Sequence, residues 1–384
     1  MNRDNPLRFM LKIGVVASLI KPMNRQQLMI LALCLLGIVT PMAAASFGAA
    51  NIHFVDVLQI FGKWLFDLSL FGVSLADISL KLGLIDWGKP SVITERIVLE
   101  LRLPRILMAF IAGAGLSIAG SVLQTVTRNP LADPYLFGIS SGASFGAVVM
   151  LTLFTGTGVL ASLDLDSRYL IWLSLPLGAF LGASLSVLIV LALSGFGMGS
   201  QVERMLLSGV ATSFMFGALT SLLLYFSSPQ ATASVLFWSL GSFAKASWTS
   251  LWLPCAIVGV GVLVVLAYQR QVTALQAGDE TAHTLGVNVP KLRLGMLMLC
   301  SLITAILVAS CGGIGFVGLM IPHTVRLLFP GRQSVLLTAL VGGLFMVWID
   351  VLARCLLGNQ ELPVGIITAV IGSVFFLVVL RQRR

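Results

Sequence analysis

Apolar runs of about 20 residues alternate with short turns marked by polar residues, Gly and Pro along most of the chain. The hydrocarbon core of a bilayer is about 30 Å thick and an α-helix rises about 1.5 Å per residue, so one crossing needs roughly 20 apolar residues. We therefore expect an all-α integral membrane protein with about ten transmembrane helices. The predicted spans are residues 28–50, 103–124, 136–156, 169–194, 205–227, 250–268, 292–311, 315–329, 335–357 and 364–380.

The spacing of the runs indicates a single transmembrane domain, residues 28–380. The flanking segments 1–27 and 381–384 are basic, which favours a cytoplasmic location for both termini and agrees with an even number of crossings. The connection 51–100 carries charges of both signs that interrupt its apolar patches, so we expect interfacial helices on the outer surface. An extra hairpin into the bilayer is the alternative. Residues 271–291 form the longest cytoplasmic connection after the N-terminus.

Composition excludes a large soluble module. The 384 residues are 58% apolar and 10% charged, against about 25% charged in a soluble domain. The net charge of +9 fits basic cytoplasmic loops better than nucleic-acid binding. The five Cys residues lack CxxC spacing, so we interpret them as core residues. Small residues at 43–45 resemble a signal-peptidase site, but the long basic leader favours an uncleaved first span.

Small residues recur at four-residue spacing within three predicted spans, which predicts close helix packing. They are Gly113, Ser117, Ser121, Gly142, Gly146, Gly178 and Gly182.

The sequence contains no residues arranged for catalysis or metal binding. It has no GxxxxGK[ST] phosphate loop, so energy for any active process must come from elsewhere. Ser140 and Ser141 have no His or acid at helical spacing, which argues against an intramembrane enzyme. A lone His323 is poor evidence for a metal site. We expect no catalytic residue, metal or cofactor in this chain.

Five short stretches, in a fixed order, identify a family. They are Arg102–Arg105 (RLPR), Arg128–Pro134 (RNPLADP) running into Gly138–Ala143 (GISSGA), Gly278–Gly286 (GDETAHTLG), Gly313–Arg326 (GIGFVGLMIPHTVR) and Glu361–Gly365 (ELPVG). From about Arg102 to Arg381 the chain resembles the FecCD family of ABC importer permeases, the type II importers that move iron-siderophores, haem and cobalamin.

The resemblance implies a ten-helix subunit of the bacterial inner membrane. It implies partners: a second permease subunit, identical or similar, around a central pathway, two separate ATPase subunits, and a periplasmic substrate-binding protein. A ferric siderophore is the favoured substrate, with haem or cobalamin as alternatives. The competing function is an ion-coupled secondary transporter. That class should show paired intramembrane acids or an inverted repeat, and the sequence shows neither.

Three arginines are candidate docking residues. Arg102 and Arg105 flank Pro104 at the outer mouth of the second span, where proline is tolerated in a first helical turn. They predict an outward-facing cationic patch, and interfacial snorkelling is the alternative. Arg354 is expected to lie in the same patch, and the alternative is that it forms an i,i+4 ion pair with Asp350; both can hold. The resemblance implies that these arginines dock acidic residues of the binding protein.

The RNPLADP stretch predicts a rigid cytoplasmic turn, because each proline restricts its predecessor and lacks an amide donor. A plain helix break is the alternative. The resemblance places this loop near the pathway and its cytoplasmic gate. The candidate gate residues are Asn129, Pro130, Leu131, Asp133, Pro134, Ser140, Ser141 and Gly142.

A short helix is predicted within 271–291. Gly278 breaks the chain, Asp279 can cap the next helix, and Gly286 ends it. The residues alone are consistent with a solvated loop helix that has no partner. The resemblance implies instead a coupling helix that fits a groove of the ATPase. The candidate coupling residues are Gly278, Asp279, Glu280, Thr281, Ala282, His283, Leu285 and Gly286.

The chain departs from the family pattern in two places. The 51–100 connection is longer than usual, and its role is open. The turn at 330–333 reads Pro-Gly-Arg-Gln instead of an acidic-His-Arg turn, which puts a specific cytoplasmic contact there in doubt.

Overall fold

The computed structural model describes residues 25–48, 52–67, 91–156, 167–194, 202–330, 334–357 and 360–382. The described residues form helices and no strand beyond one isolated bridge, which confirms the all-α membrane fold. Ten helices correspond to the predicted spans: α2 (Arg25–Ser46), α6 (Leu103–Val126), α7 (Ile139–Gly156), α8 (Ser167–Ser194), α9 (Val202–Tyr225), α11 (Trp248–Ala267), α14 (Val289–Cys311), α15 (Val317–Leu328), α16 (Val335–Cys355) and α17 (Val364–Gln382).

Eight helices in the described ranges are long and apolar enough to cross a membrane, and the apolar parts of α7 and α15 are shorter. The remaining elements are α3 (Phe54–Asp67), α5 (Val92–Arg96), η1 (Ile97–Arg102), η2 (Pro134–Phe137), α10 (Pro229–Ser239), α12 (Gln269–Ala274), η3 (Leu275–Ala277) and α13 (Asp279–Thr284). Residues 1–24, 68–90 and 383–384 lie outside the described residues, so the predicted terminal segments and much of the 51–100 connection stay predictions.

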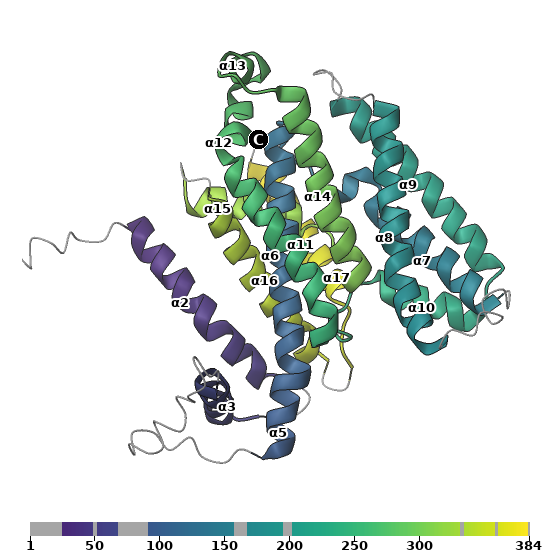
Figure 1. Cartoon of the computed structure of the whole chain (residues 1–384). Coiled ribbons are helices and arrows are strands. Elements are labelled where there is room, and N and C mark those ends of the chain that lie inside the picture. The colour runs from purple at the N-terminus through teal and green to yellow at the C-terminus, as the bar shows by residue number, and fades with distance from the viewer. Residues whose placement is uncertain are drawn as a thin grey trace, which may run out of the picture.

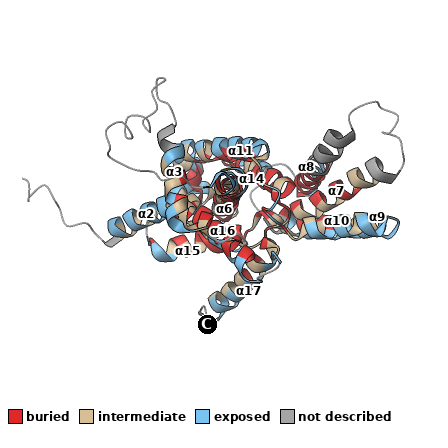
Figure 2. Ribbon diagram, turned by 90° about the horizontal axis from the view of Figure 1, so that it is seen from below, coloured by how far each residue is buried: buried red, intermediate tan, exposed pale blue. Residues whose placement is uncertain are grey.

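Helix α6 lies at the centre of the larger part of the bundle, among α11, α14, α15 and α16 (Figure 1; Figure 2). Most of α6 is buried, whereas few residues of α2, α9 and α17 are. A helix that is apolar on all sides suits such a central position. Helices α7, α8, α9 and α10 form a second group beside α14 (Figure 1). The bundle therefore has one deeply buried helix whose two ends are natural places for a site.

The second span begins earlier than predicted. The helix runs continuously from Val92, and Pro104 lies inside it instead of in its first turn. Six π-helical residues, η1, precede the proline, and within them bonds run from residue i to i−5, as from Leu103 to Val98. Proline lacks the N–H that would reach Leu99 in this pattern, and the indole of Trp248 donates to that carbonyl at 3.0 Å.

Helix α3 is amphipathic, as expected for an interfacial helix in the 51–100 connection. Val57 and Ile60 are buried, while Phe54 and Val55 are exposed. Its position relative to a bilayer stays a prediction. Helix α10 was not predicted at all, because its 11 residues are too few for a span.

The small residues do pack helices closely, as predicted. A Cβ built on Gly146 would lie 1.9 Å from the carbonyl oxygen of Gly178, and one on Gly182 would lie 2.0 Å from that of Gly142. A Cβ on Gly113 would likewise lie 2.1 Å from the carbonyl oxygen of Gly342. Helix α7 therefore crosses α8, and α6 crosses α16, at distances that only glycine permits.

We expect Gly182→Ala to lower the free energy of unfolding by about 1–3 kcal/mol, because the added Cβ must push α7 and α8 apart. The matched control is Gly259→Ala in α11, where a Cβ would meet nothing within 4 Å. The control should have an equal or higher thermal midpoint, since alanine favours helix. Thermal unfolding in detergent measures both, and equal midpoints for the two variants would contradict the packing argument.

Candidate functional site

The three predicted docking arginines lie together around a buried acid. Arg105 Nε lies 2.9 Å from Asp350 Oδ1, and Arg105 Nη1 lies 2.8 Å from Glu361 Oε2. Arg354 Nε lies 3.1 Å from Asp350 Oδ2, which confirms the predicted i,i+4 ion pair. Arg102 completes this arginine cluster. Its three guanidinium and two carboxylate groups leave one positive charge.

The expected exposed cationic patch is wrong, because Arg102, Arg105 and Arg354 are only 7%, 8% and 8% exposed. Arg102 donates to the carbonyl oxygen of Ala45, and Arg354 donates to that of Phe47 at 3.0 Å. These carbonyls lie at the end of α2, where a helix leaves its last C=O groups without intrahelical partners. The arginines thus bind the end of α2 and Asp350. Their docking role stays a prediction.

The 128–134 loop between α6 and η2 is held by its own side chains. Asn129 Oδ1 accepts from the N–H of Leu131 at 2.9 Å, and Asp133 Oδ1 accepts from that of Tyr135 at 2.8 Å. Such side-chain turns fix a local backbone shape. The turn predicted from the prolines is present, and its rigidity stays a prediction.

This loop packs against the residues that join α14 to α15. The hydroxyl oxygen of Tyr135 accepts from the N–H of Ile314 at 2.8 Å. The Asp133 carboxylate accepts from the N–H of Leu319, near the start of α15. At the same crossing, a Cβ on Gly120 would lie 1.9 Å from the carbonyl oxygen of Gly318. Two motifs far apart in sequence, RNPLADP and GIGFVGL, therefore form one contact.

Three backbone segments meet beside this contact. Ser242 donates to the carbonyl of Cys311 at 2.8 Å, and Val364 donates to that of Gly241 at 3.0 Å. Gly312 has a φ of 76°, a conformation that favours glycine, and a Cβ on it would lie 2.0 Å from Trp238 O. The glycines allow α10, α14 and α17 to meet backbone to backbone.

The other predicted gate residues do not all lie together. Ser140 lies beside Gly313, where an added Cβ would be 3.5 Å from its Oγ. Gly142 instead packs against α8, and Ser141 is partly buried on α7. Pro130 and Leu131 are exposed, while Pro134 is buried against Gly318.

Helix α13 forms where a short helix was predicted. It follows Gly278, whose φ is 112°, and ends at Gly286, whose φ is 80°. The N–H of Gly286 donates to His283 and that of Val287 to Ala282, the paired bonds of a Schellman helix end. Glu280, Thr281, His283 and Leu285 are exposed, and Ala282 is buried.

The predicted capping role of Asp279 is wrong. Gly278 occupies the N-cap position, and no side chain caps the helix. The Asp279 carboxylate instead lies 2.9 Å from Arg293 Nη2 and 3.2 Å from Arg128 Nη2. Charged partners in reach outcompete the weaker bond to a backbone N–H.

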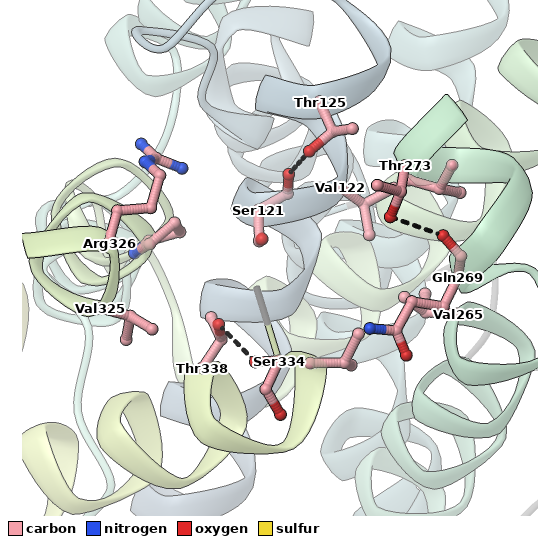
Figure 3. Close-up of a pocket in the computed structure, with 13 residues that line it drawn as sticks. Ser121, Val122, Thr125, Val265, Gln269, Thr273, Val325, Arg326, Ser334 and Thr338 are labelled. Carbon is pink, nitrogen blue, oxygen red and sulfur yellow. Dashed lines mark hydrogen bonds between the residues drawn. The ribbon is translucent and has the colours of Figure 1, made fainter. Parts of the chain in front are cut away.

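A cavity of about 50 Å³ lies between α6, α11, α12, α15 and α16 (Figure 3). The hydroxyls of Thr125, Thr273 and Thr338 donate to carbonyls of their own helices, so they present mainly acceptor oxygens to it. Its size suits a few water molecules. No group of three His, Cys, Asp or Glu side chains in the described ranges could hold a metal ion.

Sequence reasoning missed the partners that complete these clusters. Glu361 was noted only as part of a motif, and its contact with Arg105 spans 256 residues. Arg128 was noted only as the first residue of a motif, and Arg293 and Tyr135 were not singled out. Charges of opposite sign in two motifs could have indicated an ion pair between them. A single sequence does not show which motifs are in contact.

Comparison with known proteins confirms the predicted resemblance. A family model described as the FecCD transport family matches residues 35–382, which extends the match to the first span. The chain is 39% identical over 301 residues to the cobalamin import system permease protein of Halobacterium salinarum, covering 78% of this chain and 77% of that protein. It is 37% identical over 288 residues to the hemin transport system permease protein of Yersinia pestis, covering 74% and 83%.

Two further comparisons agree. An Fe(3+) dicitrate transport system permease protein of Escherichia coli is 34% identical over 327 residues, covering 83% of this chain and 97% of that protein. A solved structure described as a metal-chelate type ABC transporter in an inward-facing conformation aligns with a TM-score of 0.70 at 28% identity. That alignment covers 92% of this chain and 99% of that chain.

Asp133 should give the protein a pH-dependent stability. Burial raises the pKa of its carboxyl to about 6, although the N–H groups of Tyr135 and Leu319 favour the ionised form. The folded protein thus binds the Asp133 proton more tightly than the unfolded chain does. Protonated Asp133 therefore adds to the free energy of unfolding at low pH, and this contribution declines as the pH rises from about 4 to about 6. Asp133→Asn should remove this decline from a plot of thermal midpoint against pH. An unchanged decline in the variant would refute the assignment.

Proposed function

The chain belongs to the FecCD transport family, and we propose that this ABC importer permease brings a metal chelate from the periplasm into the cytoplasm, driven by ATP hydrolysis in a separate subunit. As a family member it is a multi-pass inner-membrane transport subunit. The observation that carries the proposal is the separation of two candidate docking sites. Helix α13 lies at one end of the molecule, and α5, which leads into the arginine cluster, lies at the other (Figure 1).

We propose that α13 binds the ATPase subunit. Leu285 is 67% exposed at its end, and Glu280 and His283 are exposed beside it. A short helix with one large apolar side chain and flanking polar groups suits insertion into a groove. The Schellman end and buried Ala282 hold the helix on the protein, so force applied to it can reach the spans.

We propose that the arginine cluster receives an acidic residue of the binding protein. Arg105 is buried, but its partner Glu361 has a side chain that is 49% exposed. A carboxylate from a partner could therefore reach Arg105 by replacing Glu361, without moving Asp350. This exchange reconciles a docking role of Arg105 with its burial.

The substrate proposal follows the relatives, whose names refer to cobalamin, hemin and Fe(3+) dicitrate. We propose a ferric siderophore first, with haem or cobalamin as alternatives, and the binding protein as the main source of selectivity.

A second permease subunit would cover the exposed aromatic side chains of α9 and α10, which include Phe214 and Phe237. Uptake of each labelled chelate into vesicles that contain the purified complex tests the substrate, and the mass of that complex tests the pairing.

We expect the tagged chain to co-purify from its native membrane with an ATPase subunit, and Leu285→Arg to reduce the recovered ATPase by about tenfold or more, because it puts a charge into the apolar contact. The matched control is Ile93→Arg, an equally exposed apolar residue near the other end of the molecule. The control should leave recovery unchanged. A chain that purifies alone and transports without ATP would overturn the proposed function.

We expect Glu361→Gln to raise the affinity for the binding protein roughly two- to fivefold at low salt, because it removes an exposed competitor for Arg105. Glu95→Gln is the control, since Glu95 pairs with Lys63 at 3.2 Å outside the cluster. Binding to the purified transporter at two salt concentrations measures both. Unchanged or weaker binding by Glu361→Gln would count against docking at this cluster.

A further inference from the structure

Helix α6 ends at a position where glycine would be the usual residue. Arg128 follows the C-cap Thr127, and its φ of 51° lies in the left-handed region. A Cβ makes this conformation unfavourable, which is why glycine is common there. The helix end alone therefore does not explain why residue 128 is an arginine, so the reason is sought in the contacts of its side chain.

The Arg128 side chain reaches the first residue of α13. Its Nη2 lies 3.2 Å from Asp279 Oδ1, and the same oxygen lies 2.9 Å from Nη2 of Arg293 on α14. Arg293 Nε also donates to the carbonyl of Val126 at 3.3 Å. Asp279 thus joins α13 both to α14 and to the loop that begins at Arg128.

The two contacts of Asp279 differ in character. The Arg293 side chain is 12% exposed, whereas that of Arg128 is 44% exposed. The first contact holds α13 on the protein, and the second, more exposed contact contributes little to stability. What the second contact adds is a direct connection between α13 and the 128–134 loop.

The 128–134 loop carries this connection onward. The carboxylate of Asp133, five residues after Arg128, accepts from the N–H of Leu319. The Tyr135 hydroxyl, two residues further, accepts from that of Ile314. A displacement of the loop would therefore act on the turn between α14 and α15, beside which α10 and α17 meet.

We propose that Arg128 is a positioning residue for transport, whose ion pair with Asp279 passes movement of α13 to the 128–134 loop. This inference rests on the proposed function, because the movement is the one that the ATPase would impose. It assigns to Arg128 a role distinct from the ATPase contact, which lies on the exposed residues of α13.

Arg128→Gly tests the proposal sharply, because glycine relieves the backbone and removes the guanidinium. In the full complex in vesicles, we expect uptake per ATP hydrolysed to fall about tenfold, with ATPase recovery and hydrolysis within about twofold of wild type and the thermal midpoint equal or higher. Arg128→Lys keeps the charge and should restore part of the uptake. Arg270→Gln is the matched control, since Arg270 is exposed on α12 and makes no ion pair within the described chain.

Asp279→Asn completes the set, because it removes the same ion pair from the other side. If both residues act through this pair, the double variant with Arg128→Gly should lose no more uptake than Asp279→Asn alone. Normal uptake by Arg128→Gly in a working complex would overturn this inference and leave the proposed function intact. A wild-type complex without ATP-driven uptake would overturn both.

Discussion

The fold depends on one constraint: backbone groups that leave the helices between spans must find hydrogen-bond partners inside the protein. The residues after α10, the end of α14 and the start of α17 do this for one another, through Ser242, Cys311, Gly241 and Val364. Tyr135 adds a side-chain acceptor for Ile314. These bonds join the end of α10, the end of α14, the start of α17 and the 128–134 loop in the arrangement that the structure shows.

The same constraint applies to charge and makes the two ends of the molecule different. Asp350 is fully buried, and it is tolerable there because two arginines donate to it. Arg354 also donates to the end of α2, as does Arg102, so α2, α6 and α16 are joined around the buried Asp350. At the α13 end the ion pairs are partly exposed and involve short segments. One end is therefore joined by buried ion pairs between long helices, and the other by more exposed ion pairs to short segments.

Local patterns in the sequence predicted the local features of this fold. The ten spans, the short helix after Gly278 and the close α7–α8 crossing depend on residues within a few turns of each other, which a single sequence displays. Features that depend on distant residues were predicted poorly. Asp279 was expected to cap its helix because no sequence rule places Arg128 beside it, and Pro104 was read as a helix start because the π-helical turn before it has no pattern. Arg105 likewise pairs with Asp350 and Glu361, which lie 245 and 256 residues away along the chain.

Backbone strain supports the view that the region around the 128–134 loop is the mechanically important one. Among the described residues, the two non-glycine residues with positive φ are Arg128, at 51°, and Phe316, at 68°. Each conformation costs roughly 1–2 kcal/mol with a side chain present, and each of these side chains makes a contact with a distant part of the chain. Arg128 contacts Asp279, and Phe316 packs on α17, where a Cβ on Gly372 would lie 2.3 Å from it. The strained residues thus flank the contact between the loop and α15. In the coupling proposed for Arg128, strain at these two positions lowers the cost of moving the loop, because a backbone held away from its preferred conformation releases that strain when it moves.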